Sequence, residues 1–512
     1  MAGFPRGKPA ASNDRGNAAY SLCKNPAGLT CGPLIVFAIS FDKWVFKENS
    51  YMNIVLVMSD DQGWGQMGYM NHPLLKTKHL NEMAENGLRF NRFYAGAPVC
   101  SPTRASVLTG RCNDRTGVYS HGWAMRQEET TLPQIMKDAG YATGHFGKWH
   151  LNGIRGAGVP IFKDDPYGPG KVGFDTWLSV TNFFDIDPVM SRNGEFEEFR
   201  GDSSDIIVEE ALQFLKEQHE AGKSSFTVIW YGSPHNPFYA YEKDIEPYKS
   251  LESKEAQRHH GEIHAMDRSI GTLRRTIREM GIEDDTLIWF NSDNGGLKEH
   301  ETEINSVGGL RDYKSSMYEG GLRVPCIVEW PENIKPNVTD IPASTADIMP
   351  TILDIAGIDR NEMLPVVDGE SIRTLLEGKE FERKRPLKFH FNRKAAAIID
   401  GKYKIIQQDL STEEYELFDL DADFTESNNI FAEDCEISKR MLGCLAEHKK
   451  SVQESINGDD YPNGIVFDHP EPVRWFKMDK YKPYFKQFIK RKEYKRYTKE
   501  LSEFISDDFD DS

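Results

Sequence analysis

CSPTRASVLTGR, residues Cys100–Arg111, is the most informative stretch of the chain. Pro98 and Pro102 disfavour a helix before this point, although a proline suits the first turn of a helix. Gly110 is a residue type that commonly ends a helix. The pattern therefore predicts a turn of small residues that opens a short helix, with Cys100 at the entrance.

Cys100 and Arg104 have either a structural or a chemical meaning. An isolated free cysteine is most often buried in a core, and the arginine near it would then be structural. Alternatively, the backbone N–H groups at a helix N-terminus favour an anion beside Cys100. Arg104 is close by and is a good partner for a tetrahedral oxyanion. The two residues alone leave both interpretations open.

The whole string from Cys100 through Leu108-Thr109-Gly110-Arg111 resembles the signature of type I sulfatases. The resemblance implies an alkaline-phosphatase-like α/β sandwich, with a large, mostly parallel mixed sheet flanked by helices. It also implies a small C-terminal subdomain with an antiparallel sheet. In that family the cysteine is converted to formylglycine (3-oxoalanine) by a formylglycine-generating maturation enzyme, and the hydrated aldehyde is the nucleophile. Cys100 would then be a precursor.

Composition limits the possible partners. The chain has 512 residues, of which 39% are hydrophobic and 28% charged, which is enough for a large core and a smaller domain. Its net charge is 62 − 80 = −18, which argues against nucleic acid as a partner. Seven cysteines do not indicate a disulfide framework. The sequence contains no run of 18 apolar residues, so no membrane span is predicted. A sulfated substrate would need a locally basic site.

We expect three parts along the chain. Residues 1–51 have no clear helix or strand period and are interpreted as an atypical leader or poorly ordered extension. The protein would be periplasmic or secreted if this is a leader, and cytoplasmic if Met52 is the true start. Residues 52–380 are predicted to form the catalytic domain. Residues 381–512 would form the C-terminal subdomain with a basic, aromatic tail.

Two predicted strands end in oxygen-rich side chains. Ile54–Met58 is followed by Asp60 and Asp61, and Thr286–Phe290 is followed by Asp293 and Asn294. Ligands bind at the carboxyl ends of strands in open α/β sheets, although each acidic pair could be a solvated turn. An all-oxygen set suits Ca²⁺ or Mg²⁺. The resemblance makes these four residues, with Cys100, the metal site, and it implies Ca²⁺, with Mg²⁺ possible.

Further polar residues follow other predicted strands. Lys148 and His150 come after Tyr141–Phe146 and, two residues apart, could face one pocket or simply end a strand. His235 lies between two prolines, where it could serve only to hold a turn. The resemblance implies that Lys148 and Lys314 bind sulfate. It also implies that His150 handles a hydroxyl proton of the hydrate and that His235 contacts the sulfate or its bridging oxygen.

Substrate contacts are harder to identify. Residues 151–205 are interpreted as a loop-rich specificity insertion. His259, His260 and His264 lie near the start of the predicted helix Glu255–Arg278. For His259 and His260, an exposed face is favoured over a substrate role. The basic, aromatic stretch Arg474–Lys499 could bind a polyanion, but packing of its aromatic rings on the core is favoured. In the C-terminal subdomain, the candidates for sugar contacts are His390, Asn392 and Arg393.

The resulting hypothesis is a sulfatase that hydrolyses a sulfate ester to an alcohol and inorganic sulfate. The substrate would be a sulfated small molecule or oligosaccharide, most plausibly a saccharide from a polysaccharide. The sequence also allows four alternatives: a broad arylsulfatase, a phosphatase or phosphodiesterase of the same superfamily, a silent sulfated-glycan-binding protein, and a Cys/His hydrolase. The last leaves the acidic residues without a role, and Cys100 argues against the phosphatase.

Overall fold

The computed structural model describes residues 52–70, 72–298, 306–432, 435–466 and 470–491, with Tyr494 and Lys499. The expectations for residues 1–51 lie outside this part of the chain. None of the helices in the described ranges is long and apolar enough to span a membrane.

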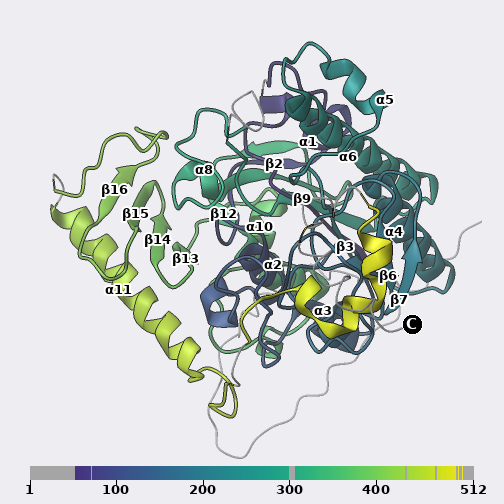
Figure 1. The fold of residues 1–512 in the computed structure, drawn as a ribbon. Helices are drawn as coiled ribbons and strands as arrows, with labels where there is room; N and C mark the ends of the chain where they lie inside the picture. The colour runs from purple at the N-terminus through teal and green to yellow at the C-terminus, as the bar shows by residue number, and fades with distance from the viewer. Residues whose placement is uncertain are drawn as a thin grey trace, which may run out of the picture. The chain divides into compact units, whose positions relative to one another are not determined.

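A twisted mixed sheet forms the centre of the structure (Figure 1). Its strand order is β11-β2-β10-β9-β1-β8-β3-β5-β6-β7, with β12 paired to β2. The middle strands β9, β1, β8, β3 and β5 are mutually parallel, whereas β10 runs antiparallel to β9 and β2. The bounds are β1 Asn53–Ser59, β2 Leu88–Tyr94, β3 Ala142–Lys148, β5 Thr176–Val180, β6 Val189–Arg192, β7 Glu195–Glu198, β8 Ser225–Trp230, β9 Thr286–Ser292, β10 Arg323–Glu329, β11 Asn337–Thr339 and β12 Ala343–Ser344.

Helices cover both faces of this sheet. Apolar side chains of β1 point to both faces, so each face must be shielded from water. Ile54, Leu56 and Met58 point into one core and Val55 and Val57 into the other, because successive side chains of a strand face opposite sides. The first core is closed by α2 Cys100–Thr109, α3 Leu132–Asp138, α9 Ile348–Ala356 and α10 Arg373–Leu376. The second is closed by α1 Lys78–Asn86, α4 Ser203–Glu220 and α6 Lys254–Glu279. Short helices are α5 Glu242–Ile245, α8 Glu319–Leu322 and α12 Phe485–Phe488.

A second, antiparallel sheet has the order β13-β14-β15-β16 (Figure 1). Its strands are β13 Leu387–Phe391, β14 Ala395–Asp400, β15 Tyr403–Gln407 and β16 Glu416–Asp419. One face packs on α11 Cys435–Asn457 and the other on residues of the large domain that include Tyr94 and Leu322. The alkaline-phosphatase-like α/β sandwich with a small C-terminal sheet, expected from the sequence, is confirmed.

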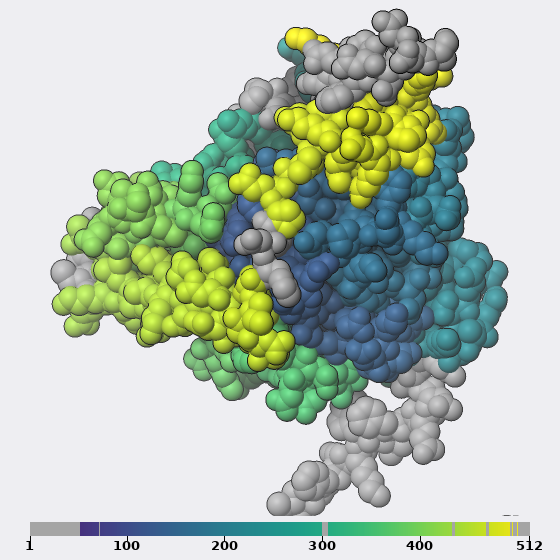
Figure 2. Space-filling model, turned by 60° about the horizontal axis from the view of Figure 1, so that its bottom comes forward, coloured from purple at the N-terminus to yellow at the C-terminus, as the bar shows by residue number. Residues whose placement is uncertain are grey.

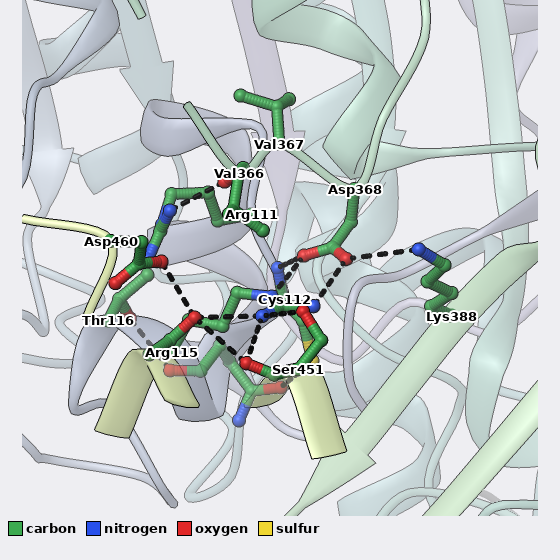
Figure 3. A network of polar contacts seen from close by, with 12 residues as sticks. Arg111, Cys112, Arg115, Thr116, Val366, Val367, Asp368, Lys388, Ser451 and Asp460 are labelled. Carbon is green, nitrogen blue, oxygen red and sulfur yellow. Dashed lines mark hydrogen bonds and ion pairs between the residues drawn. The ribbon is translucent and has the colours of Figure 1, made fainter. Parts of the chain in front are cut away.

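Buried arginines after α2 link the large domain to α11 (Figure 3). Arg115 donates from Nε and Nη2 to both carboxylate oxygens of Asp368, at 2.8 and 3.0 Å. It also donates to the Ser451 carbonyl of α11 at 2.8 Å. Arg111 contacts Asp460 at 2.7 Å, just beyond α11. Although burial favours protonated Asp368, Arg115 and Lys388 hold its pKa well below the ordinary value.

The segment after residue 470 leaves the small subdomain and packs on the large one (Figure 2). Its strand β17 Val473–Arg474 pairs in parallel with β4 Ile154–Arg155. Trp475 and Phe488 are fully buried there, against Ile154 and other residues of the insertion. The favoured interpretation of this segment, with aromatic rings packed on the core, is therefore confirmed.

Residues 151–205 are rich in loops, as expected, but they also include β4 and the sheet strands β5, β6 and β7, which are too short to show a clear period in the sequence. One sequence expectation is wrong. His259 and His260 do not lie on an exposed face, because both are fully buried in α6. Packing beside α5 and the loop around Phe238 covers this polar part of the helix. His264, by contrast, is half-buried.

Candidate active site

The carboxyl ends of four adjacent parallel strands bring the predicted residues together. Asp60 and Asp61 follow β1, and Asp293 and Asn294 follow its neighbour β9. Lys148 is the last residue of β3, and His235 lies in the loop after β8. Because β8 separates β1 from β3 in the sheet, these loops converge at one edge. Sequence positions more than 200 apart thus become neighbours.

The four oxygen-bearing side chains form one buried cluster. The Asp61 backbone N–H donates to Asp293 Oδ1 at 3.1 Å, and Asn294 Nδ2 donates to Asp61 Oδ1 at 2.9 Å. Asp60 Oδ1 and Asn294 Oδ1 are buried and have no hydrogen-bond partner among the described residues. Ligand atoms of Asp60, Asp61, Cys100 and His235 lie within 4.8 Å of one another. Orphaned, mostly oxygen donors fit a hard divalent cation.

Three cationic side chains each contact a carboxylate of the cluster. Lys148 Nζ lies 2.5 Å from Asp60, Lys314 Nζ lies 2.5 Å from Asp61, and Arg104 Nη2 lies 2.7 Å from Asp293. Burial alone would raise the pKa of Asp61, but the ammonium groups of Lys314 and Lys148 hold it well below the ordinary value. The pKa of Asp293 is raised to about 7, because burial and nearby Asp60 outweigh Arg104.

Glycines permit these close approaches. Gly147, which precedes Lys148, has φ +110°, and a side chain there would lie 1.9 Å from the Trp230 carbonyl oxygen. A side chain at Gly295, directly after Asn294, would lie 1.8 Å from the Gly320 carbonyl oxygen. Both positions therefore require the absence of a Cβ atom.

Cys100 is the first residue of α2, and its thiol is buried beside the cluster. Burial raises the pKa of this thiol to about 12, despite the opposing effects of Lys148 and Lys314. The thiol is therefore protonated near neutral pH and is poorly suited to act as a thiolate nucleophile. This disfavours a Cys/His hydrolase.

Two neutral histidines lie in the same cavity as Cys100. Burial lowers the pKa of His150 and of His235 well below the ordinary value. Neither ring nitrogen of His150 has a hydrogen-bond partner in the described part of the chain. His235 Nδ1 lies 2.5 Å from the Asn236 carbonyl oxygen, which can only accept, so Nδ1 carries the proton. His235 Nε2 is therefore unprotonated and lies 3.7 Å from Asp61 Oδ2.

The cavity has a volume of about 350 Å³. Its lining includes four predicted residues: Cys100, His150, His235 and Lys314. The predicted residues Arg104 and Lys148 do not line the cavity. Both are fully buried and form ion pairs with the acidic cluster. Nine further lining residues were not singled out from the sequence: Val99, His121, Arg155, Gly156, Asn182, Phe183, Asn236, Ser315 and Arg474. Some signal existed for most of them, because they adjoin a predicted residue or lie in the specificity insertion or the basic, aromatic stretch.

The candidates for sugar contacts do not line this cavity. His390 is buried at the end of β13, with Nδ1 2.6 Å from Asp114 Oδ2. The Arg393 backbone N–H donates to the same carboxylate at 2.9 Å. The Asn392 backbone N–H donates to the Tyr119 carbonyl at 3.0 Å. The structure thus places all three residues in contacts between the small sheet and the segment after α2.

Fold and site together define a hydrolase of the alkaline-phosphatase-like class with a buried, oxygen-rich cluster of side chains that fits a cation. The sulfatase family model matches residues 52–358, and the model for the N-sulphoglucosamine sulphohydrolase C-terminal region matches residues 309–451. The chain belongs to the sulfatase family, whose members are sulfuric ester hydrolases. Membership implies a formylglycine residue and a metal ion.

Curated relatives and a solved structure agree with this assignment. The mouse N-acetylgalactosamine-6-sulfatase is 31% identical over 389 residues, covering 69% of this chain and 71% of that protein. Human arylsulfatase A is 29% identical over 391 residues, covering 69% and 74%. The fold matches the crystal structure of Ps i-CgsB in complex with k-i-k-neocarrahexaose, with a TM-score of 0.70 and 22% identity over 82% of this chain and 95% of that one.

Proposed function

We propose that this sulfatase releases sulfate from a sulfated saccharide, with Cys100 as the residue that becomes formylglycine. The observation that carries the proposal is one cavity lined by Cys100, His150, His235 and Lys314 above the acidic cluster. Its lining is predominantly polar side chains, as a saccharide requires. Relatives named as N-acetylgalactosamine-6-sulfatases, and the match to a structure that holds a neocarrahexaose, support the same substrate class.

The cation site is proposed to hold Ca²⁺ through Asp60, Asp61, Asp293 and Asn294. Adjacent buried carboxylates need compensating positive charge, and their orphaned oxygens suit a large, hard ion. A bound ion there would lower the pKa of a hydroxyl at position 100. Arg104 and Lys148 would keep the carboxylates oriented through their ion pairs.

The remaining chemistry is assigned to side chains of this chain. A hydrated formylglycine at position 100 would supply one hydroxyl for attack on sulfur and a second for release of the sulfate. Lys314 carries protons on a nitrogen that faces the cavity, so it is the better donor to the leaving oxygen. His235 has no proton on Nε2 and would accept a hydrogen bond. His150, with an unpaired neutral ring, would accept the proton of the second hydroxyl.

Sulfate release tests this proposal. The protein would be co-expressed with a formylglycine-generating maturation enzyme, and conversion of residue 100 would be checked by peptide mass. Sulfated saccharides, an aryl sulfate and an aryl phosphate would then be assayed beside the Cys100→Ala variant. We expect release from a saccharide that the variant abolishes. Phosphate release that survives the substitution, or release from the aryl sulfate only, would contradict the proposal.

A further inference from the structure

Two arginines far apart in sequence meet at the rim of the catalytic cavity. Arg155 belongs to β4 and Arg474 to β17, and the two residues are direct partners in the parallel pairing of these strands. Side chains of directly paired residues stand on the same face of a sheet. Both arginines line the cavity that contains Cys100.

Each guanidinium is held near the cavity by neutral groups. Arg155 Nε and Nη2 donate to the His121 carbonyl at 3.3 and 3.2 Å. Its side chain occupies the space beside Gly122, where a Cβ atom would lie 2.7 Å from Arg155 Cγ. Arg474 lies over the Phe476 ring at 5.8 Å. Among the described residues, neither arginine forms an ion pair with a carboxylate.

Anchoring of the segment does not need the charge of Arg474. The Val473 backbone N–H donates to the Gly153 carbonyl at 2.9 Å, and the neighbouring Trp475 is fully buried. Tyr481 donates to the Pro160 carbonyl at 2.8 Å. These contacts hold β17 beside β4, and none of them involves the positive charge of Arg474.

The pair is also unfavourable without an anion. Two guanidinium groups repel each other, and burial together with nearby Arg474 lowers the pKa of Arg155, with only Glu471 opposing. Arg115 and Arg274, which are more buried than Arg155, each contact a carboxylate. An anionic group of a ligand between the two guanidiniums would supply the missing counter-charge.

We propose that Arg155 and Arg474 bind a second anionic group of the substrate, a carboxylate or a second sulfate, while Cys100, Lys314 and the cation site handle the scissile sulfate. The inference rests on the proposed function, because it takes the occupant of the cavity to be a sulfated saccharide. The cavity volume of about 350 Å³ suits one sugar ring with two anionic substituents. The substrate class is thus a saccharide with two neighbouring negative charges.

Binding to the full chain with Cys100→Ala tests the proposal without turnover. Three probes would be titrated: N-acetylgalactosamine 6-sulfate, its 4,6-disulfate, and the 6-sulfated sugar linked to a uronic acid. We expect at least one dianionic probe to bind about tenfold or more tightly than the monosulfate. Tighter binding of the 4,6-disulfate would identify a sulfate as the second anion. Tighter binding of the sugar linked to a uronic acid would identify a carboxylate.

Charge-removing variants then test the two arginines. Arg155→Gln and Arg474→Gln, each added to Cys100→Ala, should reduce the preference for the dianionic probe by about 10- to 100-fold. Arg474→Lys should retain part of it. Lys477→Gln removes a positive charge from an exposed position of the same segment outside the cavity and should keep the preference.

The outcomes separate this inference from the proposed function. Equal affinity for all three probes, including no measurable binding, would overturn the inference, as would an equal loss for Lys477→Gln. Selective binding that Arg474→Gln abolishes, in a protein whose matured form releases no sulfate, would support the arginine pair and contradict the catalytic assignment. Sulfate release by the matured protein, with no change in probe preference when either arginine is replaced, would support the catalytic assignment and contradict the arginine pair.

Discussion

Phe183 stacks on His235, with ring centres 4.8 Å apart and planes only 8° from parallel. The stacked face leaves the edge of His235 directed at Asp61, 3.7 Å away. Phe183 itself belongs to the hydrophobic cluster that contains Trp475. Packing of the segment after residue 470 therefore reaches a ring that touches the acidic cluster.

Phe183→Leu should lower kcat/KM for sulfate release by about fivefold. Leucine keeps the apolar volume but not the flat face, so His235 gains freedom to rotate, and loss of an aromatic pair corresponds to about 1 kcal/mol. Steady-state kinetics with an aryl sulfate measures the effect. Phe162→Leu, in the same hydrophobic cluster, is the matched control and should change little. Equal losses in both variants would show general loosening of the cluster.

Calcium should stabilise the protein after chelation. Without a cation, Asp60 Oδ1 and Asn294 Oδ1 remain buried with no hydrogen-bond partner among the described residues. Ca²⁺ at 100 times its Kd should add about 2.7 kcal/mol to the free energy of unfolding. Thermal unfolding with and without Ca²⁺ measures this gain. It should be lost in Asn294→Ala and kept in Asn361→Ala, where the residue is exposed. A gain that survives in Asn294→Ala would place the ion elsewhere.

Asp368→Asn should destabilise the protein by about 3–5 kcal/mol, because it leaves buried Arg115 without its charged partner. The depressed pKa of Asp368 means that its contribution is present above pH 3.8, the value in the unfolded chain, and is lost as pH falls toward the folded pKa. Urea unfolding at pH 7 gives the difference. Asp479→Asn removes an exposed partner of Lys482 and should cost no more than about 0.5 kcal/mol.

His145 should make the protein less stable in mild acid. Its ring is buried among Trp149, Phe174 and Trp230, and burial lowers its pKa well below the ordinary value of 6.5. The unfolded chain therefore binds one more proton below pH 6.5, which costs about 1.4 kcal/mol per pH unit. Stability from this group is complete above pH 6.5 and falls as pH decreases.

A variant isolates that effect from other titrating groups. Asp202 and Asp267 have pKa values raised to about 6 and act in the opposite direction, because the folded state binds their protons more strongly. His145→Phe should therefore flatten the dependence on pH between 6.5 and 5 relative to the wild type. His219→Phe, near the end of α4, should not. Identical slopes in the wild type and His145→Phe would contradict this account.

The site residues that could be predicted from the sequence were found through patterns of neighbouring residues. Asp60 and Asn294 directly follow apolar strands, and the rule for carboxyl ends of parallel strands places them together. Cys100 and Lys148 were assigned through motifs of consecutive residues. The burial of His259 was not predictable, because the loop around Phe238 that covers it has no helix or strand pattern that would show how it packs. Arg155 and Arg474 are joined by a two-residue strand pairing that has no pattern of its own.

The pairing of β17 with β4 also determines when, during synthesis of the chain, the rim of the cavity can be completed. A chain emerges from the ribosome with its N-terminal part first, so every side chain proposed to handle the scissile sulfate is synthesised before Arg474 is. Only the last described strand completes the rim of the cavity. Under the proposals made above, the residues assigned to breaking the ester and Arg155 all precede α11, whereas Arg474 follows it. Mutations after α11 would then alter the preference for a second anionic group without changing the residues assigned to cleavage.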